Sequence, residues 1–134
     1  MPTDIAQPAQ ALRAALVLTN AYVASSSMVV NKGDSAAFKI AFTKGSLTSL
    51  EIAVEATEED ADTADGSAVW ARVPLLEDGT VELSYTDELN YYITIPISGG
   101  PLCAQKLRCL VKGTGTVTSS ECTITGAVGV RATR

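Results

Sequence analysis

Paired carboxylates are the first candidates for catalysis, because the sequence contains no histidine. Histidine is the commonest general base and neutral metal ligand, so its absence removes many enzyme mechanisms. Adjacent acids occur at Glu77 with Asp78 and at Asp87 with Glu88, and glycoside hydrolysis does use two acids at a fixed separation. Both pairs lie in turn-like sequence, where adjacent acids are ordinarily solvated. The sequence therefore predicts no catalytic residue and no enzyme.

Three cysteines, Cys103, Cys109 and Cys122, are the candidate nucleophiles and metal ligands. They lack the paired spacing of zinc and redox motifs, and without histidine the usual base for a cysteine nucleophile is missing. If residues 103 to 109 form a strand, Cys103 and Cys109 share a face but lie about 20 Å apart, too far for a disulfide. We expect buried, reduced thiols, and the chain is expected to bind no cofactor and no metal.

Five acids and no large apolar residue lie in the run of residues 58–65. Calcium prefers several carboxylate oxygens at short range, so this run is a candidate cation site. Its spacing does not follow the EF-hand pattern, however, and its glycine, Gly66, follows the run instead of lying within it. We interpret residues 58–65 as a solvated acidic loop, with calcium binding as the alternative.

The aromatic side chains could build a core or a binding surface. We expect four of them to anchor the core: Phe38, Phe42, Trp70 and Tyr91. Tyr91 and Tyr92 must face opposite sides of their strand, because successive side chains alternate. Tyr22 and Tyr92 are the candidate interface residues, since tyrosine is enriched at interface centres. A plain exposed tyrosine is the alternative for each. A sugar-stacking platform is the alternative for Trp70, Tyr85, Tyr91 and Tyr92.

Apolar residues recur at every second position from Phe38 onward, which is the period of half-buried strands. The pattern predicts strands at residues 38–42, 50–56, 68–73, 81–85, 91–97, 107–111 and 117–130. Turn sequences separate them, among them residues 112–115. Residues 113–115 resemble a fragment of a phosphate loop, but the Gly-Lys-Ser/Thr that would follow is missing, so a hairpin turn is the better interpretation. Pro96 cannot donate a backbone hydrogen bond, so its strand should lie at a sheet edge or stop pairing before it.

The number and spacing of these strands predict the fold class. About seven to eight antiparallel strands with turns every 8 to 12 residues or so are typical of a single all-β sandwich, here jelly-roll-like. Residues 1–15 mix proline, alanine and glutamine, and we expect them to form an extended N-terminal arm. Residues 16–134 then form the sandwich domain. A chain of 134 residues suits one domain of this kind.

The charge balance limits the partners. Ten basic and 15 acidic residues give a net charge of -5, the wrong sign for following a phosphate backbone, so we expect no nucleic-acid binding. The longest early apolar run, residues 14–18, is far shorter than the roughly 20 residues that span a bilayer. Asp4 stands where a signal peptide would carry lysine or arginine. We expect synthesis in the cytoplasm, with no membrane and no small-molecule substrate as a partner.

Two segments resemble a known class of protein. FKIAFTKGSLTSLEI at residues 38–52, followed by Trp70, and LRCLVKGTGTV at residues 107–117 are similar to segments of small β-sandwich virion structural proteins of tailed bacteriophages. The resemblance covers about residues 36 to 131 and carries no catalytic motif. This sequence departs from that class at residues 58–66, an acidic connection that is longer than a usual hairpin loop.

The resemblance implies a role in the virion. Members of such a class decorate or cement the capsid exterior after synthesis in the host bacterium, or form part of the neck, tail or fibres. The implied partners are the major capsid protein and copies of this chain, in a trimer or another symmetric oligomer. A carbohydrate-binding β-sandwich module is the alternative from a different class.

Overall fold

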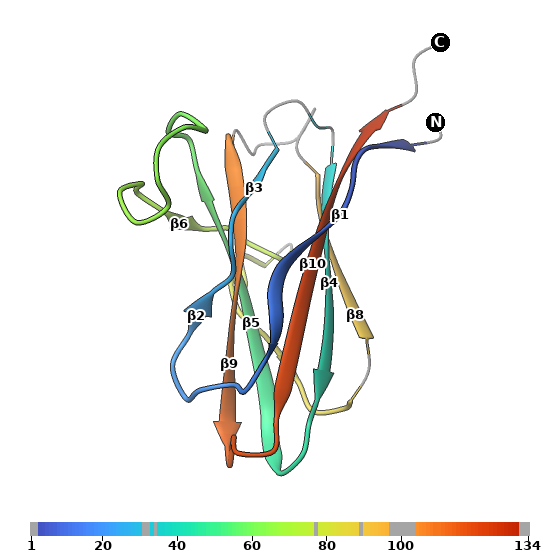
Figure 1. Cartoon of the computed structure of the whole chain (residues 1–134), viewed down its shortest axis with the longest axis vertical. Helices are drawn as coiled ribbons and strands as arrows, with labels where there is room; N and C mark the ends of the chain where they lie inside the picture. The colour runs from blue at the N-terminus through green and yellow to red at the C-terminus, as the bar shows by residue number, and fades with distance from the viewer. Residues whose placement is uncertain are drawn as a thin grey trace.

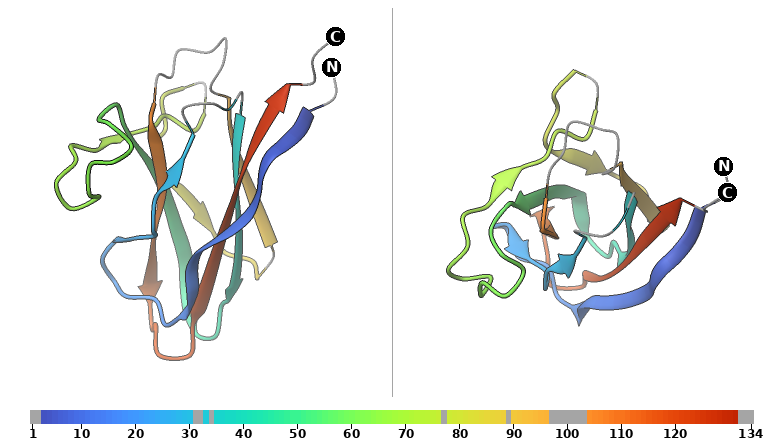
Figure 2. Two further views of the ribbon diagram at one scale, coloured as in Figure 1. Left: turned by 45° about the horizontal axis from the view of Figure 1, so that its top comes forward. Right: turned by 90° about the horizontal axis from the view of Figure 1, so that it is seen from above.

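The computed structural model describes residues 3–30, 33, 35–76, 78–88, 90–96 and 104–131. In this part of the chain all regular structure is β-strand, arranged as two antiparallel sheets packed face to face (Figures 1 and 2). The prediction of an all-β sandwich is confirmed. None of the described residues forms a helix that could cross a membrane.

The four-stranded sheet has the order β1-β10-β4-β8. Its strands are β1 (Thr3–Leu16), β10 (Glu121–Arg131), β4 (Ser35–Thr43) and β8 (Asn90–Pro96), and every neighbouring pair is antiparallel. Strand β8 pairs with β4 alone among the described strands, so Pro96 lies in an edge strand as predicted. Ile97 and Cys103, which the sequence placed in or near strands, lie outside the described residues.

The second sheet is built on the long strands β5 (Leu47–Thr57) and β9 (Lys106–Gly115). Strand β9 also pairs with β2 (Val23–Ala24) and β3 (Met28–Val29), while β5 also pairs with β6 (Ala71–Arg72) and β7 (Leu83–Tyr85). Both long strands carry the alternating apolar pattern, whereas their four neighbours are two or three residues long. The segment expected to form a strand at residues 68–73 pairs only at Ala71 and Arg72.

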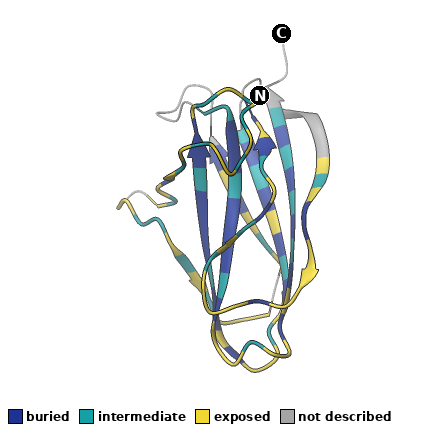
Figure 3. Cartoon of the chain, turned by 60° about the vertical axis from the view of Figure 1, so that its left-hand side comes forward, coloured by how far each residue is buried: buried dark blue, intermediate teal, exposed yellow. Residues whose placement is uncertain are grey.

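Alternate residues of the long strands enter the core between the sheets. In β4 the buried positions are Ala36, Phe38, Ile40 and Phe42. Figure 3 shows buried residues concentrated on the long strands and exposed residues on the connections. Burial of a large apolar side chain contributes about 1.5–3 kcal/mol to stability. Phe38 and Phe42 therefore occupy the core positions expected of them.

The N-terminal segment is extended, and it pairs with its own chain. Strand β1 runs along β10 from the pair Thr3 with Arg131 to the pair Leu16 with Cys122, with several register shifts. Arg13 is buried at the far end of β1, where its Nε donates to the Cys122 carbonyl at 3.1 Å. Residues 3–15, expected as an arm, thus form an edge strand of the sandwich.

One predicted turn lies in a different place. Residues 112–114 continue β9, because they pair with β5 at Glu51, Leu50 and Ser49. The chain leaves the sheet at Gly115, whose φ of 97° is one that favours glycine. The turn between β9 and β10 is therefore at residues 116–120, where the Ser120 N–H donates to the Val117 carbonyl at 3.0 Å.

Candidate interaction surfaces

The outer face of the six-stranded sheet is lined by charged side chains. We call this surface the charged face and define it by Glu51, Glu55, Arg72, Arg108 and Lys112. Glu51 pairs across the strands with Lys112, and Glu55 lies between Arg108 and Arg72. Such cross-strand charge pairs stabilise a sheet by a few tenths of a kcal/mol, up to about 1 kcal/mol.

Glu55 is the centre of an ion-pair network on the charged face. Arg108 donates from Nε at 2.9 Å and from Nη2 at 2.8 Å to the same carboxylate oxygen of Glu55. Arg72 approaches the other oxygen with its Nε at 3.4 Å. The Nη1 atom of Arg72 also lies 3.6 Å from Glu82. The network links β9, β5 and β6.

Hydroxyl groups surround the second carboxylate of the charged face, that of Glu51. Ser49 Oγ donates to Glu51 at 2.5 Å and Ser84 Oγ at 2.9 Å, and the Thr114 hydroxyl donates to the other oxygen. Burial acts to raise the pKa of Glu51, but these three hydrogen bonds and the charge of Lys112 outweigh it and lower the pKa. Glu51 is therefore an ionised acceptor at neutral pH.

Tyr22, a predicted interface residue, lies half-buried on the charged face. Its ring stacks against two cations, with Arg72 Cζ and Lys112 Nζ each 4.8 Å from the ring centroid. Burial, with the negative charge of Glu82 nearby, raises the pKa of Tyr22 to about 12. The phenol is neutral at neutral pH, and its ring face lies against the two cations.

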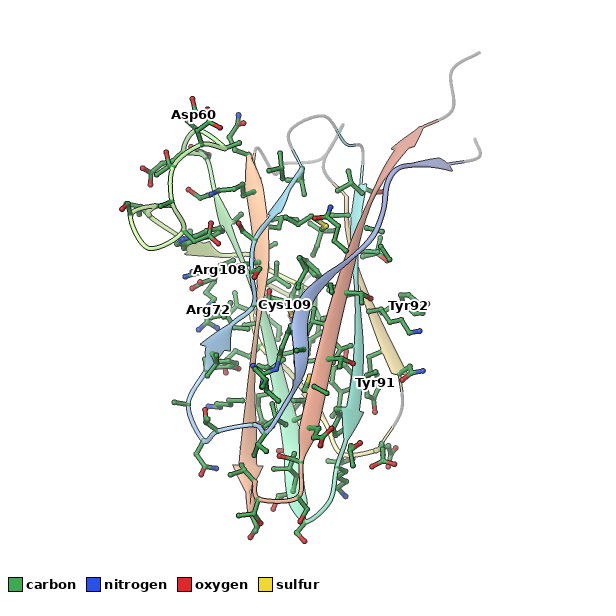
Figure 4. All side chains as sticks on the ribbon, viewed as in Figure 1. Asp60, Arg72, Tyr91, Tyr92, Arg108 and Cys109 are labelled. Carbon is green, nitrogen blue, oxygen red and sulfur yellow. The ribbon has the colours of Figure 1, made fainter. Side chains whose placement is uncertain are left out.

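Trp70, expected in the core, lies instead on the outer side of β9 and is half-buried. Its indole Nε1 donates to the Asp65 carbonyl at 2.9 Å, and the guanidinium of Arg108 stacks 4.2 Å from the ring centroid. The physical reason is that an indole N–H needs a partner and an aromatic face attracts a cation. Figure 4 shows Arg72 and Arg108 on this side of the molecule.

The acidic run of residues 58–65 folds back onto β9. Asp65 accepts a hydrogen bond from Lys106 Nζ at 2.9 Å and another from Ser27 Oγ at 2.7 Å. Burial acts to raise the pKa of Asp65, but these hydrogen bonds and the charge of Lys106 outweigh it and lower the pKa. Glu59 accepts from the Val69 N–H. Among the described residues no group of three or more acids, cysteines or histidines is placed to hold a metal ion.

A pocket of about 430 Å³ lies beside this run. Its walls are Val69, Arg72, Val73 and Pro74 together with the end of β5. Val69 at its rim is 78% exposed.

Tyr91 and Tyr92 face opposite sides of β8, as the alternation predicts. Tyr91 packs against the core, where its ring stacks on Tyr85 at 3.8 Å and on Phe42 at 6.0 Å between centroids. Tyr92 is 68% exposed and points away from the sandwich (Figure 4).

The outer face of the four-stranded sheet, which we call the four-strand face, is the surface that carries Tyr92. Small side chains occupy most of its outward positions on β4 and β10: Ala37, Ala41, Thr123, Thr125 and Ala127. A hollow of about 250 Å³ crosses all four strands, from Ala15 to Asn90.

Two cysteines lie in the described part of the chain, and both are buried free thiols. Burial raises the pKa of Cys122 to about 11 and raises that of Cys109 further. These thiols are therefore protonated and unreactive at neutral pH.

No protein-family model matches this sequence, and no curated protein matches it. Among solved structures, the SPBc2 prophage-derived protein YomS is similar, with 19% identity, a TM-score of 0.56 and 96% of each chain covered. A family 16 carbohydrate-binding module matches with 11% identity and a TM-score of 0.42, over 94% of this chain and 87% of that chain. The first comparison shows a β-sandwich fold shared over nearly the whole of both chains.

Proposed function

We propose that this chain is a non-enzymatic structural protein of a phage virion, which decorates the capsid exterior and stabilises the shell by binding the major capsid protein. The observation that carries the proposal is the end-to-end similarity of fold to a prophage-derived protein, over 96% of both chains. The resemblance of residues 38–52 and 107–117 to phage sandwich proteins supports the same assignment from the sequence.

The chemistry of the charged face also supports a binding role. Glu51 accepts hydrogen bonds from three hydroxyl groups, and Glu55 accepts from Arg108 and lies against Arg72. Carboxylates engaged in this way make a sheet rigid, whereas acid–base catalysis needs a group poised to exchange a proton. A rigid sandwich suits a protein that acts through its surface.

Binding to empty shells tests the proposal. Expanded shells of a phage major capsid protein should bind this chain in cosedimentation, and their melting temperature should rise because a ligand of the assembled state stabilises that state. Absence of binding to any shell, with association to purified tail or neck parts, would overturn the capsid assignment in favour of the other virion locations.

Carbohydrate binding is the alternative function, and it predicts a different result. The Trp70 ring is already stacked on Arg108 and its N–H is bonded to Asp65. We therefore expect a panel of neutral and acidic sugars to leave the fluorescence of this single tryptophan unchanged. A saturable change with one sugar would favour the carbohydrate-binding function.

A further inference from the structure

A protruding side chain and a hollow lie on the same surface, the four-strand face. Tyr92 is the protrusion, with 68% of its surface exposed. The hollow of about 250 Å³ is lined by Asn90, Thr43, Ala41 and Glu121, among others. Its volume is enough for one tyrosine side chain. An exposed tyrosine beside a hollow of this size is the arrangement of an interface anchor and its pocket.

Two opposite charges on the same face have no ion-pair partner among the described residues. Lys39 of β4 and Glu121 of β10 are exposed, and neither makes an ion pair within the described part of the chain. Between them, the outward positions are small or satisfied, as at Thr123, whose hydroxyl donates to the Ala41 carbonyl at 3.3 Å. A second sheet could therefore approach this surface closely.

The strand register places these features symmetrically about one line across the sheet. Ala41 is opposite both Asn90 and Thr123. Lys39 and Tyr92 are opposite each other, two residues to one side of that line. Glu121 is opposite Thr43, two residues to the other side. Two residues of a strand span about 7 Å, so the two rows lie at equal distances from the line.

We propose that the four-strand face is a self-complementary interface through which two copies of this chain pair about a two-fold axis. The axis lies between the facing sheets and runs across the strands at the level of Ala41. It brings Tyr92 of each copy to the edge of the other copy's hollow, at Asn90 and Thr43, and Lys39 of each copy over Thr43 of the other, one strand from Glu121. Such an isologous contact uses the same residues twice.

The size of the face places the pairing among weak, transient interfaces. Four strands of about seven residues at the usual spacing give roughly 450 Å² per copy. The total of roughly 900 Å² is below the about 1,200–2,000 Å² of stable specific interfaces and in the range of transient ones, so we expect a weak dimer that dissociates in the micromolar range. A two-fold dimer also differs from the trimer that the resemblance implies.

Sedimentation of the whole purified chain tests the inference directly, without capsid shells. Its failure is therefore distinct from failure of shell binding. The mass should rise from that of one chain to that of two between low micromolar and near-millimolar concentration. Tyr92→Ser should weaken the pairing by about tenfold or more, since it removes the side chain at the edge of the hollow.

Charge-reversal variants test the proposed contact between Lys39 of one copy and Glu121 of the other. Lys39→Glu and Glu121→Lys should each abolish the dimer in the same concentration range, because like charges then lie one strand apart across the interface. A mixture of these two variants should form a heterodimer, detectable by native mass spectrometry, since each then presents the charge that the other needs. The double variant should dimerise as the wild type does.

Two exposed residues outside the four-strand face provide matched controls. Val69→Ser replaces an exposed apolar side chain and Glu58→Lys reverses the charge of an exposed acid, and both should leave dimerisation unchanged. A wild type that remains monomeric throughout overturns the inference. So does a dimer that survives both single charge reversals, and so does a mixture of the two that forms no heterodimer.

Discussion

Lys106 is a buried cation whose hydrogen-bond acceptors come from the acidic run of residues 58–65. Its side chain is 5% exposed, and its ammonium donates to the Thr63 carbonyl at 2.6 Å and to Asp65 at 2.9 Å. A buried cation is costly unless acceptors surround it, so the run supplies them. The sequence suggested that these acids are solvated or bind an external cation, whereas Asp65 binds a cation of the chain itself.

Removal of the Asp65 carboxylate should therefore destabilise the fold. We expect Asp65→Ala to lower the free energy of unfolding by about 1–3 kcal/mol, because Lys106 keeps its burial and loses its charged partner. Urea unfolding measures the change. Asp62→Ala, in an exposed position of the same run, should shift it by no more than about 0.5 kcal/mol. Equal losses of unfolding free energy in the two variants would contradict stabilisation of the buried Lys106 by Asp65.

The same carboxylates predict how stability depends on pH. In the folded chain the pKa values of Asp65 and Glu51 lie below their ordinary values of 3.8 and 4.5. The unfolded chain therefore binds more protons in this range, and stability rises with pH. We expect the urea midpoint to be level near neutral pH and to fall as the pH drops through 4.5 and below 3.8.

Asp65→Asn should show a shallower fall over the same range, since one of the two carboxylates no longer titrates. A wild-type midpoint that stays level down to about pH 3 would contradict the lowered pKa values.

At the scale of elements, two turns pack against each other at one end of the sandwich. Gly45 lies in the turn between β4 and β5 with a φ of 57°. A Cβ atom at Gly45 would lie 2.7 Å from the carbonyl oxygen of Ser119, which belongs to the turn between β9 and β10. This glycine therefore meets a conformational and a steric requirement together.

Gly45→Ala should destabilise the chain by about 1–3 kcal/mol, because both the positive φ and the backbone contact resist a side chain. Thermal or urea unfolding gives the measurement. Gly66→Ala is the matched control, since a Cβ there meets nothing within 4 Å, and its effect should stay within about 0.5 kcal/mol. A Gly45→Ala variant as stable as the control would show that the turns move apart freely.

The elements also show which parts of the fold a sequence can predict. Strands β4 and β5 were predictable because their branched and aromatic residues alternate with polar ones over a long run. Strand β1 was not, since its alanines and glutamines have little strand preference and its conformation depends on pairing with β10. Local sequence carries no record of a partner more than a hundred residues away.

The candidate surfaces were predictable to a smaller extent. The opposite orientations of Tyr91 and Tyr92 follow from strand alternation alone, and both agree with the structure. Trp70 could not be placed, because its position depends on Arg108 and Asp65, which reach it only through the folded chain. The hollow beside Asn90 depends likewise on four strands and leaves no local signal.

At the scale of the whole molecule, both sheets share one core. Side chains of β4 and β10 meet those of β5 and β9 in a single buried cluster. Neither sheet can lose its partner without exposing that cluster to water, so we expect one cooperative unfolding transition.

Two probes test this cooperativity. Trp70 emission reports on the connection that packs over β9, and far-ultraviolet circular dichroism reports on the strands. Their urea transitions should coincide, since Trp70 and Lys106 tie that connection to the sheet. An earlier transition in Trp70 emission would show instead that residues 58–70 open while the sandwich remains folded.

The pairing of β1 with β10 has a consequence for synthesis in the cell. Thr3 pairs with Arg131 and Leu16 with Cys122, so β1 leaves the ribosome long before its partner exists. Until residue 131 has been translated, the four-stranded sheet cannot close, and β1 is an unpaired strand that other nascent chains can capture. Contacts so distant along the chain also favour slow folding, on the scale of milliseconds to seconds. Production of this protein in quantity should therefore depend on translation rate and temperature more than on the final stability of the sandwich.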